Sequence, residues 1–186
     1  YEKIVLVKEA LTLKSATFTH GRQMGKTLIL PVRWNLATAK PVLTTNPTEK
    51  LLTNGIRGSL KYSDFEWCSW TDNDSVSFTI DLLKPEVLNT LTLGCITNNG
   101  MAIHKPASVK VEVSDDNSKF REAAMQSFTP KEIFREGNFI ENLSLKLGGI
   151  QGRYVRVTAK GPGVCPASHV RPGQTSRIFF DEVILE

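Results

Sequence analysis

The feature that most constrains the fold of this chain is a two-residue alternation of apolar and polar side chains. In the run SVSFTIDL (75–82) every second residue is apolar, and the residues between them are serine, threonine and aspartate. The runs ASVKVEVS (107–114), FIENLSLKL (139–147) and YVRVTA (154–159) repeat this pattern. Successive side chains of a β-strand point to opposite faces, so the alternation predicts strands that each bury one face.

Turn-forming residues separate these runs. The segment SDDNSKF (114–120) predicts a hairpin turn, and glycines mark loops at 97–101 and 147–153. The segment KGPGVCPASHVRPGQTS (160–176) is rich in proline and glycine, which predicts a long irregular loop. Apolar residues nowhere recur with helical spacing over a helix-length window. Short strands joined by such turns predict an all-β, antiparallel sandwich or barrel.

Length and composition narrow the functional class. The chain has 186 residues, of which 40% are hydrophobic and 23% charged, as in a globular protein. No run approaches the about 18 apolar residues that argue for a membrane span, so we expect no membrane insertion. The net charge of +4 is spread along the chain rather than gathered on one element, which argues against a nucleic-acid partner.

The first 32 residues differ from the rest. YEKIVLV, LTLKSATFTHGRQM and KTLILPV are interpreted as strands, with HGRQMG as a turn, and Pro31 then breaks the pattern. We place a domain boundary near Pro31 to Trp34, between 1–32 and 33–186. Three short strands do not make a stable core. We therefore expect 1–32 to be the end of a preceding domain that packs on the main one, in a chain excised from a longer protein.

The three cysteines, Cys68, Cys95 and Cys165, form no Cys-x-x-Cys motif, and no Cys/His spacing suits a zinc site. An odd number leaves at least one thiol unpaired, and Cys68 and Cys95 could meet across strands. We interpret the cysteines as small buried side chains.

Four motifs in order resemble those of galactose-binding-like, discoidin-type domains, which include the family 32 carbohydrate-binding modules. The resemblance covers about 33–186 and implies a discoidin-type antiparallel β-sandwich, or jelly roll. The motifs are WNLATAKPV with LLTNGIRGS, VSFTIDLLKPEVLNTLTLG, HKPASVKVEVSDDNSKF and GRYVRVTA.

A narrower resemblance concerns LTNGIRGS…W…W and CPASHVRPGQTSRIFFDEVILE. Both are similar to the discoidin-type domain at the C-terminus of bacterial family 20 β-N-acetylhexosaminidases. The segment YEKIVLVKEALTLKSATFTHGRQMGK is similar to the last strands of the Ig-like, chitobiase-type domain that precedes it there. The resemblance implies an accessory region of a secreted, periplasmic or cell-surface glycoside hydrolase. Its partners would be a glycan or glycoconjugate and the catalytic domain of the parent chain.

The same resemblance implies a structural Ca²⁺ between an Asp-Gly loop and a glutamate of the last strand. The matching positions here are Asn54 and Glu182. Calcium takes six to eight oxygen ligands, and asparagine in place of aspartate removes one negative charge. The alternative is a simple turn at Asn54 and a solvated Glu182.

Carbohydrate sites combine an aromatic ring, which stacks on the sugar, with polar side chains on loops at one end of a sandwich. Trp67 matches a structural tryptophan of the family, whereas Trp70 stands where the family has phenylalanine. The candidates for carbohydrate binding are Trp70, His169, Arg57, His104 and Asn98. Exposure of Trp70 or His169 in a groove would favour carbohydrate binding. Burial of both would favour a purely structural domain that packs on the catalytic domain and holds no glycan.

The carboxylates do not predict catalysis. A glycosidase needs two carboxyl groups about 5–10 Å apart across the scissile bond. Asp115 and Asp116 lie in a predicted turn, and Asp181 and Glu182 are neighbours in a predicted strand, so their side chains point apart. We predict that the chain itself is not an enzyme.

Overall fold

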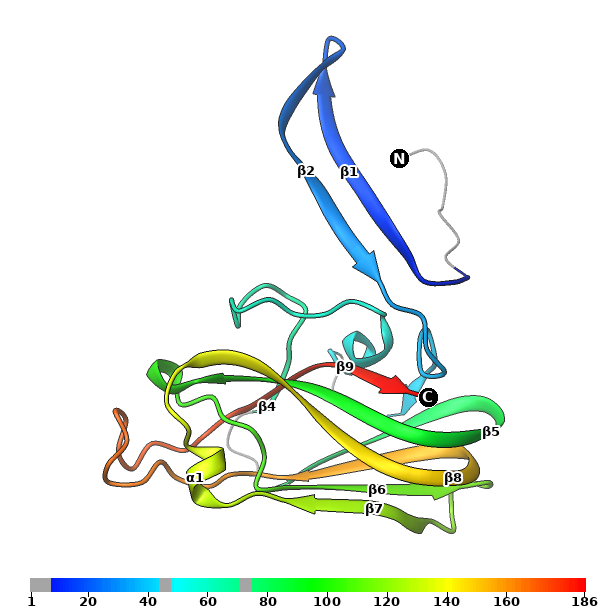
Figure 1. Cartoon of the computed structure of the whole chain (residues 1–186), viewed down its shortest axis with the longest axis vertical. Coiled ribbons are helices and arrows are strands. Elements are labelled where there is room, and N and C mark those ends of the chain that lie inside the picture. Colours follow the sequence, from blue (N-terminus) through cyan, green and yellow to red (C-terminus); the bar gives the residue numbers. More distant parts are fainter. Residues whose placement is uncertain (1–7, 44–47, 71–74) are drawn as a thin grey trace.

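The computed structural model describes residues 8–43, 48–70 and 75–186, and it consists of an antiparallel β-sandwich and a projecting β-hairpin (Figure 1). The all-β fold class predicted from the sequence is therefore confirmed. The strands of the sandwich are β3 (Val42–Leu43), β4 (Cys68–Trp70), β5 (Ser75–Asn98), β6 (Ser108–Ser114), β7 (Arg121–Ser127), β8 (Asn138–Lys160) and β9 (Ile178–Leu185).

The sandwich is one antiparallel sheet that folds back on itself. Its strand order is β4-β9-β5-β8-β6-β7, and β3 also pairs with β5. The long strands β5 and β8 pair along their whole lengths, from Ser75 opposite Lys160 to Asn98 opposite Asn138. Their register shifts between Asp81 and Glu86, where both strands bend (Figure 1). The two halves of the sheet enclose the main core, and Trp67, Ile96, Ile103 and Phe179 form a second, smaller apolar cluster.

The core confirms the faces that the alternation predicts. In the first part of β5 (75–82), in β6 and in the second half of β8, the apolar side chains on the predicted face are buried and those between them are mostly more exposed. Phe139 is the exception, because it lies near the start of β8 and is only half-buried. The predicted inward residues that are buried are Val76, Phe78, Ile80, Leu82, Val109, Val111, Val113, Leu143, Leu145, Leu147, Val155, Val157 and Ala159.

An ion pair fixes the bend of the sheet. The guanidinium of Arg153 donates two hydrogen bonds of 2.8 Å to the carboxylate of Asp81. This pairing, opposed by partial burial, lowers the pKa of Asp81 below its usual value. The backbone N–H of Leu83 donates to the same carboxylate at 2.8 Å. A two-pronged contact of this kind holds planar groups in one orientation, so it ties β5 to β8 where the register shifts.

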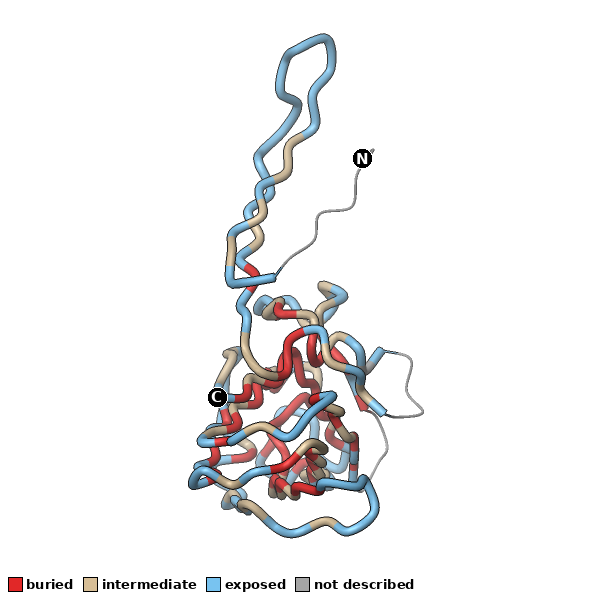
Figure 2. The backbone as a smooth tube through the Cα atoms, turned by 90° about the vertical axis from the view of Figure 1, so that its right-hand side faces the viewer, coloured by how far each residue is buried: buried red, intermediate tan, exposed pale blue. Residues whose placement is uncertain are grey.

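The hairpin of β1 (Leu11–Thr19) and β2 (Arg22–Val32) projects from the sandwich and is largely exposed (Figure 2). Its turn is His20-Gly21, both with positive φ, so β2 begins earlier than the predicted turn HGRQMG allows. Phe18 and Leu28 are 62% and 63% exposed. The hairpin therefore extends away from the sandwich rather than packing on it. The strand expected at 1–7 lies outside the described residues.

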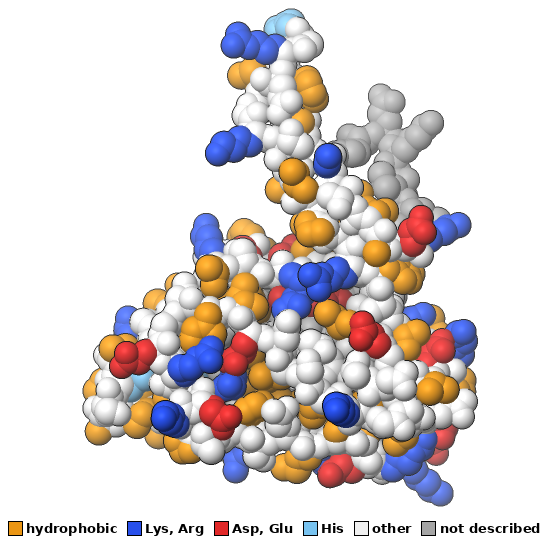
Figure 3. Space-filling model, viewed as in Figure 1, with side chains coloured by type: hydrophobic (Ala, Val, Ile, Leu, Met, Phe, Trp, Pro, Cys, Tyr) orange, Lys and Arg blue, Asp and Glu red, His pale blue; other side chains and the backbone are white. Residues whose placement is uncertain are grey.

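Helical structure is limited to short turns within the described part of the chain. These are η1 (Glu49–Thr53), η2 (Asn99–Met101) and α1 (Pro130–Ile133). No helix there has the length and apolar character needed to cross a bilayer. On the face in Figure 3, basic and acidic side chains are interspersed over the sandwich, which agrees with the spread of charge along the sequence.

Candidate functional site

Three loops meet at the end of the sandwich opposite the C-terminus, and we call this the loop end (Figure 1). Arginine side chains connect two of them: Arg171 donates to the carbonyl of Gly100 at 2.8 Å, and Arg177 to that of Met101 at 2.7 Å. Because loops on a rigid sheet often carry binding residues, this end is the natural place for a site. The loops are 99–107, 128–137 and 161–177.

A pocket of about 720 Å³ lies at the loop end. Pockets of roughly 300–1,000 Å³ hold small ligands in proteins. Residues from all three loops line it, so the pocket exists only in the folded chain. The lining residues are Lys105, Pro130, Lys131, Glu132, Phe134, Arg135, Glu136, Pro166 and Ser168. We call this the loop-end pocket.

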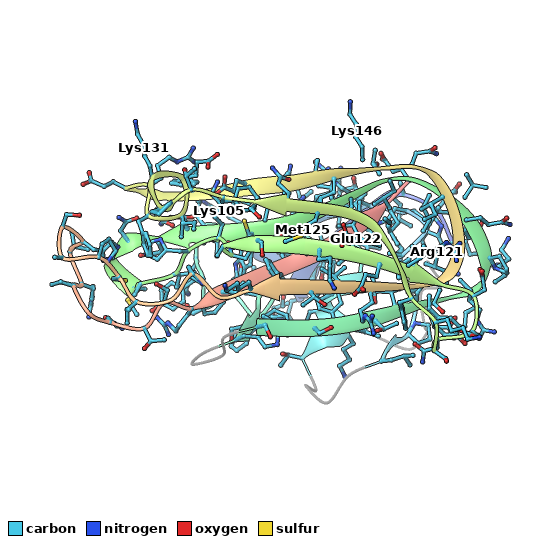
Figure 4. The ribbon with its side chains drawn as sticks, turned by 90° about the horizontal axis from the view of Figure 1, so that it is seen from below. Lys105, Arg121, Glu122, Met125, Lys131 and Lys146 are labelled. Atoms are coloured by element: carbon cyan, nitrogen blue, oxygen red, sulfur yellow. The ribbon has the colours of Figure 1, made fainter. Side chains whose placement is uncertain are left out.

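The lining of the pocket combines an apolar surface with a charged rim. Phe134 is half-buried, and its ring meets that of His104 edge to face, with centroids 5.1 Å apart. Lys131, Arg135 and Glu136 are exposed. Figure 4 shows Lys131 extending outward from α1, with Lys105 near the same end.

Two of the charged lining residues already have partners. Lys105 is buried, and its ammonium donates to Glu141 at 3.0 Å. Glu132 completes a capping box with Thr129, whose hydrogen bonds lower the pKa of this carboxyl. The exposed polar groups on the rim are therefore Lys131, Glu136 and Ser168. Arg135 is also exposed, and its guanidinium lies over the ring of Phe139, 3.8 Å from the centroid.

The structure brings two of the candidate sugar-binding residues together, behind the pocket. The rings of His104 and His169 lie 5.0 Å apart between centroids. His104 is fully buried and His169 is 9% exposed, so neither ring opens to solvent. Asn98 is half-buried at the end of β5, where its backbone pairs with Ile103.

Trp70 lies in the core. It is 7% exposed, stacks on Phe78 with centroids 6.3 Å apart, and packs against Phe180 at 5.6 Å. This placement does not fit a platform for a sugar ring. Trp67 is also buried, and its indole N–H donates to the carbonyl of Ser59 at 3.0 Å. Burial of both Trp70 and His169 is the arrangement that we associated with a structural role.

The side chain of Arg57 forms hydrogen bonds within the sandwich. Its Nε donates to Asp181 at 2.7 Å and its Nη2 donates to Asn142 at 2.8 Å. Gly94 gives this guanidinium its space, because a Cβ there would lie 2.3 Å from Nη2 of Arg57. Arg57 therefore has a structural partner and does not line the loop-end pocket.

The candidate metal residues lie at a buried corner. The backbone N–H of Gly55 donates to Oε2 of Glu182 at 3.0 Å. Oε1 is buried and makes no hydrogen bond of ordinary geometry, although the side chain of Asn35 lies close to this carboxyl. Burial raises the pKa of Glu182 to about 9, so without a cation this carboxyl is protonated at neutral pH. The side chain of Asn54 accepts from the N–H of Ile56 at 2.8 Å and donates to Glu66 at 2.9 Å. The unpaired oxygen of Glu182 fits a cation ligand, whereas Asn54 is already engaged.

The residues of 130–136 were missed in the sequence analysis. A signal was present, because Thr129-Pro130-Lys131-Glu132 has the spacing of a capping box with proline at the first helical position. The structure forms this capping box at the start of α1. The signal locates a helical turn but does not show that it faces the loop 161–177.

Comparisons with known proteins agree with this architecture. The sequence profile of the F5/8 type C domain family matches residues 38–170, more than half of the chain. A search of curated proteins gave no match.

Solved structures share the fold at low sequence identity. CpGH89CBM32-6 from Clostridium perfringens superposes with a TM-score of 0.54 and 18% identity, over 82% of this chain and 98% of that one. A fucose binding module from Streptococcus pneumoniae, SpX-3, gives 0.52 and 18% over 82% and 97%. Chitosan-binding module 1 from a Paenibacillus chitosanase/glucanase gives 0.52 and 15% over 83% and 99%.

Proposed function

Because this chain belongs to the F5/8 type C domain family, we propose that it is a non-catalytic module that binds carbohydrate in the loop-end pocket. The observation that carries the proposal is the pocket itself, where a phenylalanine and two prolines adjoin charged side chains of both signs. Solved structures of the same fold include modules described as binding fucose and chitosan. Domains of this type are typically non-catalytic.

The lining of the pocket matches both the apolar face and the hydroxyl groups of a sugar. A pyranose has an apolar C–H face, which would lie on Phe134 or the adjacent Pro130. Its hydroxyl groups both donate and accept hydrogen bonds, and the rim offers donors on Lys131 and Arg135 and an acceptor on Glu136. The pocket is open to solvent and small, so we expect binding of one or two sugar units with weak affinity.

Weak affinity is sufficient for an accessory module. A module tethered to an enzyme raises the local concentration of its polymer substrate without any new contact at the catalytic centre. We propose that the parent chain is a secreted glycoside hydrolase, similar to the β-hexosaminidases. The motif order in 1–32 and 33–186 supports this proposal.

The proposal predicts that removing the pocket's polar rim weakens glycan binding. We expect Lys131→Ala to lower affinity for GlcNAc- or galactose-containing ligands about tenfold, because it removes a charged hydrogen-bond donor. Phe134→Ala should abolish detectable binding. Isothermal titration calorimetry after a glycan-array screen would measure both effects.

Lys146→Ala is the matched control, since this exposed lysine lies on β8, away from α1 (Figure 4). It should bind like the wild type. The absence of binding at millimolar sugar, or equal losses in Lys131→Ala and Lys146→Ala, would contradict the proposed site.

A second candidate function rests on the hairpin. Phe18, Met24, Leu28 and Ile29 are exposed apolar side chains on β1 and β2. An isolated two-stranded hairpin is marginally stable in water. These side chains would be covered if the hairpin packs on the catalytic domain of the parent chain, with the sandwich as a structural spacer that binds no glycan.

We also propose that Glu182 holds a structural Ca²⁺, with backbone carbonyls of the neighbouring loop. The cation would replace the proton on the buried carboxyl and tie the last strand to the Gly55 turn. Calcium should therefore raise the melting temperature of the wild type measured by differential scanning calorimetry. Glu182→Gln should remove this shift, while Glu122→Gln, an exposed glutamate on β7, should retain it. An equal calcium shift in Glu182→Gln would count against the assignment.

A further inference from the structure

Behind the loop-end pocket lies a buried cluster of His104, Cys165 and His169. One nitrogen or sulfur atom from each residue lies within 4.8 Å of the others, and all three residues are buried. The segments that carry them are joined by the backbone N–H of His104, which donates to the carbonyl of Arg177 at 3.0 Å. An isolated bridge between Ile103 and Arg177 continues this contact. The cluster is therefore a product of the fold.

The loop that carries two of these residues is internally braced. The N–H of Cys165 donates to the carbonyl of Gln174, and the N–H of Gly173 donates back to Cys165, both at 2.9 Å. The N–H of His169 donates to the carbonyl of Pro166 at 2.9 Å. This bracing fixes where the thiol and the imidazole sit relative to each other.

Three ring nitrogens of the cluster lack a hydrogen-bond partner of ordinary geometry. Neither ring nitrogen of His104 has a hydrogen bond of ordinary geometry, and Nε2 of His169 has none. The Cys165 sulfur lies 3.5 Å from the hydroxyl of Ser176. Buried polar side-chain atoms in proteins are nearly always satisfied. Unpartnered nitrogens of His104 and His169 beside the Cys165 thiol therefore point to a ligand between the three side chains.

The donor set defines the kind of ligand. A neutral imidazole offers a metal ion the lone pair of one ring nitrogen, and a thiolate offers a sulfur lone pair. Two imidazoles and a thiolate are the donors that zinc and similar borderline-soft ions prefer. Calcium and magnesium prefer oxygen, so this cluster differs in chemistry from the corner at Glu182.

We propose that His104, Cys165 and His169 bind one divalent ion of the zinc class, with water in the fourth position. Zinc lies about 2.0–2.1 Å from nitrogen and about 2.3 Å from sulfur in tetrahedral sites. Ligand atoms in such a tetrahedron are about 3.3–3.7 Å apart, so the side chains must close by roughly 1 Å. Binding releases the thiol proton to solvent, because only the thiolate coordinates.

Metal binding must also rearrange a proton on His169. The N–H of Arg171 now donates to Nδ1 of His169 at 3.0 Å, which places the proton of the neutral ring on Nε2. Coordination through Nε2 moves that proton to Nδ1, and the Arg171 amide must turn away. The carbonyl of Ile133 lies near the ring of His104. In the metal-bound state this carbonyl can accept the remaining N–H of His104.

Cobalt provides a direct test on the full chain. After removal of metal by EDTA and dialysis, titration with Co²⁺ should produce a near-ultraviolet thiolate-to-cobalt charge-transfer band that saturates at one equivalent. Zn²⁺ should then displace the cobalt and bleach the band. A wild type that shows no such band would overturn the proposal.

Variants assign the ligands. Cys165→Ala should abolish the band, and His169→Ala should weaken binding by at least about tenfold. His20→Ala, in the exposed hairpin turn, is the control and should bind like the wild type. A band that survives Cys165→Ala would refute the site.

A second measurement uses the wild type alone, so it does not depend on whether the variants fold. Zn²⁺ should shift the amide NMR resonance of Arg171 in the wild type, because its hydrogen bond to His169 must break. An unmoved Arg171 resonance at saturating Zn²⁺ would equally overturn the proposal.

Discussion

Replacement of Trp70 by alanine is expected to lower the free energy of unfolding by about 3–5 kcal/mol, the usual cost of deleting a large aromatic side chain from a core. Trp70 fills the space between Phe78 of β5 and Phe180 of β9. Its loss leaves a cavity that strands on both sides of the core can close only in part. Urea unfolding followed by circular dichroism would measure the change.

Trp34→Ala is the matched control, because Trp34 is 42% exposed. Its effect should stay within about 0.5–1 kcal/mol. Trp70→Phe should fall between the two, since it keeps a ring in the stack. If Trp70→Ala abolished glycan binding while leaving stability unchanged, the side chain would be a sugar platform and its assignment to the core would be wrong.

Replacement of Asp181 by alanine should cost a similar amount, about 3–5 kcal/mol, for an electrostatic reason. The fully buried carboxylate accepts from Nε of Arg57 at 2.7 Å and from the N–H of Gly58 at 2.9 Å. It also accepts from the N–H of Glu182 at 2.6 Å. Its removal leaves a largely buried guanidinium and two backbone donors without their partner.

Asp115→Ala tests the same chemistry at the surface. Asp115 pairs with Arg121 at 3.3 Å, and both side chains are exposed. Exposed pairs contribute about 0–1 kcal/mol, so this variant should unfold almost like the wild type. Equal effects of Asp115→Ala and Asp181→Ala in thermal and urea unfolding would show that burial of the pair has been misjudged.

The strands could be predicted from the sequence because their signal is local. Val109, Val111 and Val113 alternate with polar residues, and the face that they share is the face that is buried. The turn at His20-Gly21 is also local, although the predicted turn HGRQMG was too long, since β2 begins at Arg22. The projection of the hairpin was not predictable, because local sequence does not show whether a hairpin packs on the neighbouring sandwich.

The site was harder to predict because it is built by contacts between distant segments. His104 and His169 were candidates as loop residues, but their meeting depends on how the loop 161–177 folds against His104. The zinc rules use short ligand spacings, which fail when Cys165 and His104 come from separate loops. Trp70 was considered a platform from its departure from a family pattern. The two-residue spacing from Cys68 gave the better signal, because it places Trp70 on the same face of β4 as Cys68. Both side chains are buried, and Ser69 between them is exposed.

The central claim is that carbohydrate binds in the loop-end pocket, and amide NMR of the full chain titrated with oligosaccharide tests it most directly. We predict that chemical-shift changes gather in 130–136, at Lys105 and in 166–168. The hairpin and the core around Trp70 should remain unchanged. Shifts confined to the hairpin, or no shifts at millimolar glycan, would contradict this account and favour the structural role.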